Sequence, residues 1–148
     1  MTQSTMTHSN PTNAELYALL SSARTLAIVG ASSNPDRPSH GIMRKLQQEG
    51  YRTVPVNPHE TGVLGETAYP SLLAVPVPVD IVVVFRRPEY TPAIANEAVA
   101  IKAKALWMQS GIENEEAAAK AKAGGLTVVM DACVATVHVV LRVPAKVA

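Results

Sequence analysis

The residues from Gly30 to Ser39 have the types and spacing of a loop that binds a phosphate group. Gly30 ends an apolar run and permits a tight turn close to a ligand. Ser39 is predicted to cap the helix that follows, and the first backbone N–H groups of a helix have no partners within it. Such a helix start favours an anion. With Arg37 just upstream, this spacing predicts a phosphate-bearing ligand.

Two predicted strands hold this loop in place. Residues 26–29 are apolar without polar alternation, which is typical of a parallel strand covered by helices on both faces. A second strand is predicted over residues 53–56. It ends at Asn57 and Pro58, where nucleotide-binding folds contact the sugar or base. The stretch from Leu26 to Pro58 therefore predicts half of a nucleotide-binding fold.

The rest of the chain continues the alternation of strands and helices. Further strands are predicted over residues 81–85, 105–108 and 126–130. Besides the helix after the first loop, helices are predicted over residues 13–23, 91–103 and 113–123. This order predicts an α/β protein with a single Rossmann-like, doubly wound domain and a five-stranded, mainly parallel sheet over residues 13–148.

Polar and special residues gather where the predicted strands end. These ends are residues 30–33, 57–59, 85–88, 109–112 and 131–133. The opposite ends, near Arg24 and Lys104, show no comparable pattern. Because ligands of doubly wound sheets bind beyond the carboxyl ends of the strands, we expect the binding cleft at that edge.

Composition argues against several classes of protein. The chain has 148 residues, of which 47% are hydrophobic and 4% aromatic, and a formal net charge of +1. These values favour neither disorder nor nucleic-acid binding. No run approaches the ~18 apolar residues of a membrane span. A single cysteine, Cys133, fits a reducing compartment, so we predict a cytoplasmic protein, with residues 1–12 as a disordered tail.

The first loop departs from the dinucleotide fingerprint. Ser32 and Pro35 stand where the G-x-G-x-x-G pattern has its later glycines. The second strand ends at Asn57 rather than at the Asp or Glu that accepts a hydrogen bond from the ribose of NAD. NAD is therefore disfavoured, although Glu60 lies nearby.

Several segments in series resemble stand-alone coenzyme A-binding proteins, which look like the N-terminal domain of the succinyl-CoA synthetase alpha subunit. The segments are VGASSNPDRPSHGI, PVNP, DIVVVFRRPE, KALWMQSGI with ENEEAAAKA, and GGLTVVMDACVATVH. The resemblance covers residues 25–138 and implies a domain that binds CoA or an acyl-CoA. The chain departs from the family pattern at Ala132 and Ala135, where basic residues are expected, and at Val137, where an acidic one is expected.

The resemblance also implies which residues hold the cofactor across the strand ends. The implied pyrophosphate contacts are Gly30, Ala31, Ser32, Arg37 and Ser39. The implied adenosine contacts are Asn57 and Pro58. The implied pantetheine path follows Phe85, Arg86, Gln109 and Gly111.

The residue types rank the candidates within this set. Arg37 and Arg86 are the best phosphate cations because a guanidinium matches phosphate oxygens in pairs, and Arg87 is the weaker candidate. Trp107 lies mid-strand and is predicted to be core rather than a base-stacking platform. We expect Cys133 to be a largely buried, unreactive thiol, since Asp131 opposes a thiolate and no cation adjoins it.

The sequence predicts a binding protein rather than an enzyme. No catalytic constellation is evident, the histidines are not spaced as metal ligands, and the synthetase domain with the phosphorylated His is absent. We expect non-catalytic binding of CoA or an acyl-CoA, for sensing, carrying or presenting it to an unidentified protein partner. The alternatives are an enzyme of the NAD(P)-type dinucleotide-binding class and an interaction module with a decayed cleft, which the altered ACVATVH segment keeps open.

Overall fold

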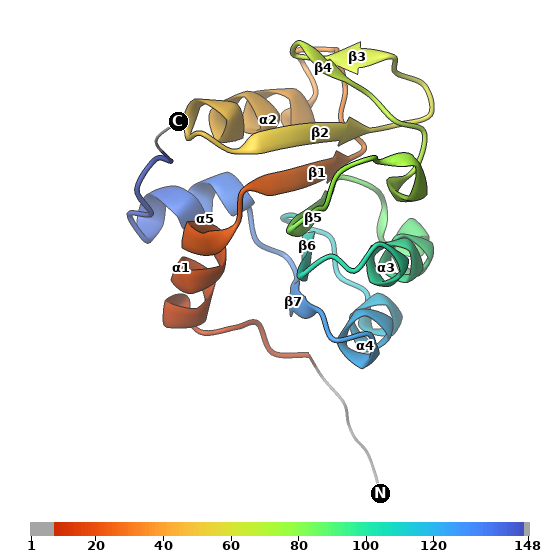
Figure 1. Ribbon diagram of the computed structural model, residues 1–148. Helices are drawn as coiled ribbons and strands as arrows, with labels where there is room; N and C mark the ends of the chain where they lie inside the picture. Colours follow the sequence, from red (N-terminus) through yellow and green to blue (C-terminus); the bar gives the residue numbers. More distant parts are fainter. Residues whose placement is uncertain (1–7, 147–148) are drawn as a thin grey trace, which may run out of the picture.

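The computed structural model describes residues 8–146 and shows three layers, with helices on both faces of a central sheet (Figure 1). The sheet has five parallel strands in the order β2-β1-β5-β6-β7. Helices α3 and α4 pack on one face, and α1, α2 and α5 pack on the other. The predicted doubly wound α/β fold is confirmed.

The elements lie close to their predicted positions. The sheet strands are β1 (Thr25–Val29), β2 (Arg52–Val56), β5 (Ile81–Val84), β6 (Ala105–Met108) and β7 (Thr127–Val129). The helices are α1 (Asn13–Ser22), α2 (Pro38–Gln48), α3 (Thr91–Ala100), α4 (Glu115–Ala123) and α5 (Val134–Val140). The connections add the short hairpin β3 (Gly62–Val63) and β4 (Glu66–Thr67), and the 3-10 turns η1 (Leu72–Ala74) and η2 (Pro88–Tyr90).

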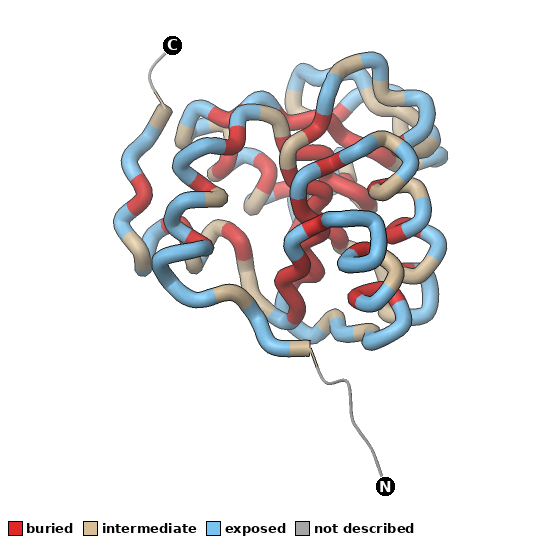
Figure 2. The backbone as a smooth tube through the Cα atoms, turned by 60° about the horizontal axis from the view of Figure 1, so that its bottom comes forward, coloured by how far each residue is buried: buried red, intermediate tan, exposed pale blue. Residues whose placement is uncertain are grey.

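The central strands are buried on both faces, as Figure 2 shows in red along the middle of the molecule. In β5, Val82 and Val84 pack toward α3 and α4, whereas Ile81 and Val83 pack toward the opposite helices. Their continuous apolar sequence is the consequence, because neither face of these strands meets water. Trp107 in β6 is fully buried, which confirms its prediction as a core residue.

The start of α2 differs from the prediction. Arg37 is the N-cap residue, and Pro38 occupies the first helical position, where a missing N–H is no loss. Ser39 therefore lies inside the first turn and does not cap the helix. The prediction that Ser39 caps α2 is wrong because the fixed φ of Pro38 starts the helix two residues earlier.

Helix α5 has no counterpart among the sequence predictions. Its sequence, VATVHVV, is rich in β-branched residues, which lower the intrinsic tendency to form a helix. The helix packs against α1 and α2 and buries Val134 and His138. Tertiary packing thus decides a conformation that local propensity does not favour.

The predicted disordered tail, residues 1–12, lies partly outside the described residues, since only residues 8–12 are described. These five residues are held to the domain. Asn10 donates to the Met130 carbonyl and accepts from the Met130 amide, both at 2.8 Å. Thr12 and Glu15 form a capping box at the start of α1.

Across residues 8–146, no helix is both long enough and apolar enough to span a membrane.

Candidate functional site

A cleft of about 450 Å³ opens at the carboxyl edge of the sheet. It lies between the start of α2, which follows β1, and the segment after β5. In a sheet of this order the chain winds in opposite directions on either side of the β1–β5 pair, so the edge is open there. The volume lies within the usual range for small-molecule sites. The cleft is therefore where the strand order predicts a ligand.

The structure brings together five of the predicted site residues in this cleft. They are Arg37, Ser39, Phe85, Arg86 and Gln109. The other six do not line it, and their contact with a ligand stays a prediction. They are Gly30, Ala31, Ser32, Asn57, Pro58 and Gly111.

The cleft also contains residues that sequence reasoning did not select. They are Pro38, Ile42, Arg87, Pro88, Ser110, Ile112 and Cys133. A signal for Ile42 was present, because it lies three residues after Ser39 on the same face of α2. Pro38 begins α2, and the other five lie within the strand ends 85–88, 109–112 and 131–133, where the cleft was expected without these side chains being selected.

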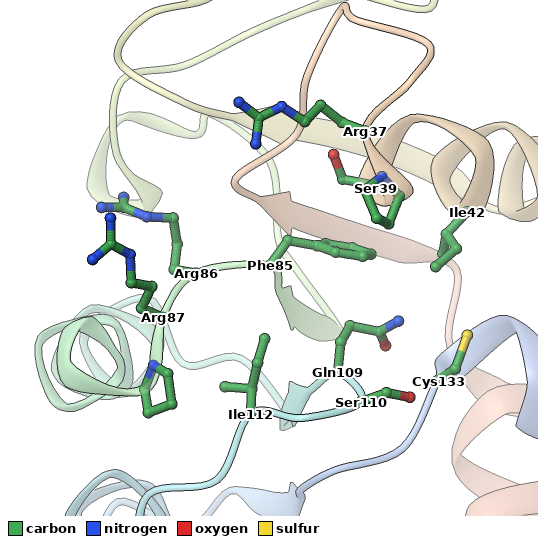
Figure 3. A pocket seen from close by; sticks show the side chains of 12 residues that line it. Arg37, Ser39, Ile42, Phe85, Arg86, Arg87, Gln109, Ser110, Ile112 and Cys133 are labelled. Atoms are coloured by element: carbon green, nitrogen blue, oxygen red, sulfur yellow. The ribbon is translucent and has the colours of Figure 1, made fainter.

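The two ends of the cleft differ in chemistry (Figure 3). The side chains of Arg37, Arg86 and Arg87 gather toward one end, and Cys133 lies at the other. The ring of Phe85 lies between them. A ligand along this cleft would therefore meet cationic groups, then an apolar surface, then a thiol.

The three arginines are not equivalent. Arg87 is exposed and lies 3.9 Å from the Glu89 carboxylate. The Arg86 guanidinium stacks over the Tyr90 ring, 4.5 Å from its centroid, which restrains its position. Within the described part of the chain, neither Arg86 nor Arg37 pairs with a carboxylate. These two side chains are therefore the cations available to a phosphate, in agreement with the sequence ranking.

The loop between β1 and α2 holds itself together through its own donors. The Ser33 amide and hydroxyl both donate to the Glu60 carboxylate, at 2.8 and 3.0 Å. The Asn34 amide donates to the Ser32 hydroxyl, and the Asp36 amide donates to the Asn34 side chain. The hydrogen bonds from Ser33 hold the pKa of Glu60 below its usual range. Because these loop amides are occupied, side chains rather than the loop backbone are the main donors left for a phosphate.

Gly30 is required by packing. Its φ is +89°, and a Cβ there would lie 2.7 Å from the Phe85 carbonyl oxygen. Asn57 donates to the Ala31 carbonyl and accepts from the His59 amide, so both ends of its side chain are occupied. These residues join the ends of β1, β2 and β5 and thereby place the walls of the cleft.

Three hydrogen bonds tie the segment between β7 and α5 to the end of β6. They run from Trp107 Nε1 to the Ala132 carbonyl, from the Val134 amide to Gln109 Oε1, and from the Gly111 amide to the Asp131 carboxylate, at 2.8, 2.9 and 2.7 Å. Gln109 is only 4% exposed. Residues 131–134 are therefore held firmly beside the cleft.

Cys133 is less buried than predicted, and its predicted lack of reactivity stays a prediction. It is only partly buried and lines the cleft. Burial alone would raise its pKa, but hydrogen bonds from Thr136, Ala135 and Gln109 hold the pKa below the usual range. The sequence alone did not show this, because Ala135 and Thr136 favour the thiolate only once they form the first turn of α5, and Gln109 follows β6, 24 positions earlier.

Ser39 is the most deeply buried polar residue of the cleft, with 3% of its surface exposed. Its hydroxyl makes no hydrogen bond to any residue in the range 8–146. This hydroxyl is therefore available to a ligand.

Among the described residues, no group of three or more His, Cys, Asp or Glu side chains is arranged to hold a metal ion.

Comparison with other proteins shows small relatives of nearly the same extent. The chain is 41% identical over 133 residues to the uncharacterized protein YneT of Bacillus subtilis, covering 90% of this chain and 98% of that one. It is 33% identical to a solved hypothetical protein from Pyrococcus horikoshii, with a TM-score of 0.87, covering 93% and 99% of the two chains. The fold and its extent are thus shared with stand-alone proteins.

Two further matches concern the family and a larger protein. The family model described as CoA binding domain matches residues 24–139. An ADP-forming acetate–CoA ligase II of Archaeoglobus fulgidus is 30% identical over 95 residues, which is 62% of this chain and 14% of the ligase.

Proposed function

Because the chain belongs to the CoA-binding domain family, we propose that it binds coenzyme A or an acyl-CoA without catalysing a reaction, and senses, carries or presents this ligand. The order of groups along the cleft is the observation that carries the proposal. Coenzyme A has phosphates at one end, the pantetheine chain in the middle and a thiol at the other end. The cleft offers arginines, an apolar wall and a thiol in the same order.

The proposed contacts follow from the chemistry of the lining residues. Arg37 and Arg86 bind phosphate oxygens, because guanidinium groups form paired, charge-assisted hydrogen bonds with them. The Ser39 hydroxyl lies beside Arg37 and donates to the same part of the ligand. Phe85 packs against the pantetheine chain, and the Gln109 side chain lies where an amide of that chain passes.

The absence of catalysis is supported by the kinds of side chain in the cleft. Of the described residues that line it, none is a His, Asp or Glu, the usual general acids and bases. The titratable groups there are three arginines and Cys133. Such a set suits binding and presentation of a ligand better than proton transfer.

A ligand screen by thermal unfolding tests the proposal. CoA or acetyl-CoA at ~100 times its Kd should stabilise the folded state by about 2.7 kcal/mol, which raises Tm by several degrees in a domain of this size. NAD, NADP and ATP serve as the comparison ligands. Equal or greater stabilisation by NAD or NADP would instead support the dinucleotide-binding alternative. No stabilisation by any of these ligands would support an interaction module with a decayed cleft.

A further inference from the structure

Cys133 is placed where the far end of a bound ligand would arrive. It is the single cysteine of the chain, and its side chain lines the cleft at the end opposite the arginines (Figure 3). Cys133 is partly exposed and lines the cleft, so a ligand in the cleft can reach this residue. A ligand anchored by its phosphates on Arg37 and Arg86 therefore extends toward this thiol.

A second observation indicates that the cleft is built for a polar ligand. Ser39 lines the cleft with only 3% of its residue surface exposed, and its hydroxyl makes no hydrogen bond within residues 8–146. A hydroxyl that lines a cleft without a partner in the protein can donate a hydrogen bond to a ligand that enters the cleft. A ligand that accepts from Ser39 beside Arg37 is thus in position before its other end meets Cys133.

The surroundings of Cys133 favour thiol exchange. Residues 131–134 are held by hydrogen bonds donated by Trp107 and Gly111 and by one that Gln109 accepts from the Val134 amide, so the backbone at Cys133 has a defined position. Hydrogen bonds from Thr136, Ala135 and Gln109 outweigh burial and hold the pKa of the thiol below its usual range. The thiolate is the attacking species in disulfide exchange, so this environment increases the reactive fraction at neutral pH.

We infer that Cys133 is a covalent attachment site for coenzyme A, which it takes from CoA disulfide to form a protein–CoA mixed disulfide; this inference rests on the proposed function. The Cys133 thiolate attacks one sulfur of CoA disulfide. The S–S bond of that disulfide breaks as the new Cys133–CoA bond forms. The second CoA leaves as a thiolate and takes a proton from water. One CoA is thereby reduced, Cys133 is oxidised, and CoA disulfide is the oxidant.

This attachment gives the same cleft two ligand states. Reduced CoA or an acyl-CoA binds reversibly, whereas oxidised CoA becomes attached until a thiol removes it. A disulfide without phosphates would lack the contacts with the arginines. If the arginines guide the ligand, CoA disulfide should therefore react with Cys133 faster than such a disulfide. The protein would then respond to the ratio of oxidised to reduced CoA.

Intact mass spectrometry of the full chain after incubation with CoA disulfide tests the inference. We expect a gain of one CoA moiety that dithiothreitol removes, and no gain in the Cys133→Ser variant. Glutathione disulfide at equal concentration should react at least about tenfold more slowly, because it lacks the phosphate anchor. Arg37→Ala should slow the reaction with CoA disulfide about tenfold and leave the reaction with glutathione disulfide unchanged. Arg44→Ala, an exposed residue of α2 outside the cleft, is the matched control and should change neither rate.

The controls separate this inference from the proposed function. Calorimetry with reduced CoA, in the presence of a phosphine reductant, measures reversible binding alone. Reversible binding without an adduct overturns the attachment at Cys133 and leaves the proposed function intact. Equal rates with CoA disulfide and glutathione disulfide also overturn it, because the cleft then gives no guidance. Absence of both reversible binding and the adduct overturns the two proposals together.

Discussion

The two ends of strand β1 each carry a carboxylate that accepts backbone hydrogen bonds, yet their surroundings differ. At the amino end, Asp80 accepts from the amides of Arg24 and Thr25 at 2.8 and 3.0 Å. Its side chain is 20% exposed and lies 3.5 Å from Lys104. Beyond the carboxyl end, Glu60 accepts from Ser33 on an open loop. The first carboxylate has three partners at the amino edge, and the second holds Ser33 of the β1–α2 loop at the edge where the cleft opens.

The same contrast holds for the two edges of the sheet. On the amino side, the Tyr51 hydroxyl donates to the Leu20 carbonyl, and Lys146 donates to the Ser21 carbonyl and stacks over the Tyr51 ring. Burial raises the pKa of Tyr51 to about 12. On the carboxyl side, neither Arg37 nor Arg86 pairs with a carboxylate among the described residues, although Arg86 stacks over Tyr90. Polar groups at the amino edge stabilise the fold, and those at the carboxyl edge are available to a ligand.

The largest effect is expected from Asp80→Ala. Two amides at the start of β1 and the Lys104 ammonium would lose their acceptor, so the free energy of unfolding should fall by about 2 kcal/mol. Because Asp80 lies at the opposite edge from the cleft, CoA affinity should not change. Urea unfolding and calorimetry measure the two quantities.

The variant Asp80→Asn is the matched control for this prediction. Its side-chain oxygen can still accept from Arg24 and Thr25, so the loss of stability should be smaller than in the alanine variant. Weaker CoA binding by Asp80→Ala at unchanged stability would contradict the proposed division between the two edges.

The next largest effect is expected from Arg37→Ala. Unlike Asp80→Ala, this variant should change CoA affinity rather than stability. CoA affinity should fall about tenfold, or 1.4 kcal/mol, because a charge-assisted phosphate contact is removed. The free energy of unfolding should change by less than about 0.5 kcal/mol, as is usual for exposed side chains. Arg44→Ala on the same helix is the control. Equal affinities for the two variants would show that Arg37 is only a solvated charge.

His138 lies on α5, the helix that begins beside the cleft and ends near the amino edge of the sheet. The helix starts after Cys133, and its His138 packs edge-on against Tyr51, with ring centroids 5.7 Å apart. Burial lowers the pKa of His138, Glu49 opposes this shift, and Lys45 and Lys146 add to it. The unfolded state therefore binds a proton more readily.

A smaller, pH-dependent effect follows for His138. Its contribution to stability should be fully present above pH 6.5, the ordinary pKa, and should be lost progressively as the pH falls through the lower folded pKa. Urea unfolding at several values between pH 7.5 and 5 should show this slope, and His138→Phe should reduce it. His59→Phe, at an exposed position, is the control. An unchanged slope in His138→Phe would assign the pH dependence to other groups.

The smallest effect is expected from Glu60→Gln. Removing a negative charge close to the cleft should raise CoA affinity about twofold at low salt, and the gain should disappear at high salt because exposed charges are screened. Glu66→Gln on the exposed β4 strand is the matched control. A loss of affinity in Glu60→Gln would mean that the carboxylate orders the loop for the ligand rather than opposing it.

The sheet and most of its helices could be predicted from the chain alone. The apolar runs that became β5 and β6 have no polar alternation, and only strands covered on both faces keep such runs out of water. The alternation of strands with helices then required parallel pairing, which brings the strand ends to one edge. Phe85, Arg86 and Gln109 could be placed in the cleft on this ground, and Arg37 and Ser39 from the predicted start of the helix after the first loop.

The remaining features depended on contacts between segments far apart in the chain. Helix α5 forms from β-branched residues because α1 and α2 cover it, and Cys133 acquires its environment from Gln109, 24 positions earlier, as well as from α5. The Ser33 amide is occupied by Glu60, which lies beyond β2. The sequence by itself determined which residues must be buried, because hydrophobic burial follows local pattern. Only the tertiary structure decided which polar groups were left free, because hydrogen-bond partners are chosen across the fold.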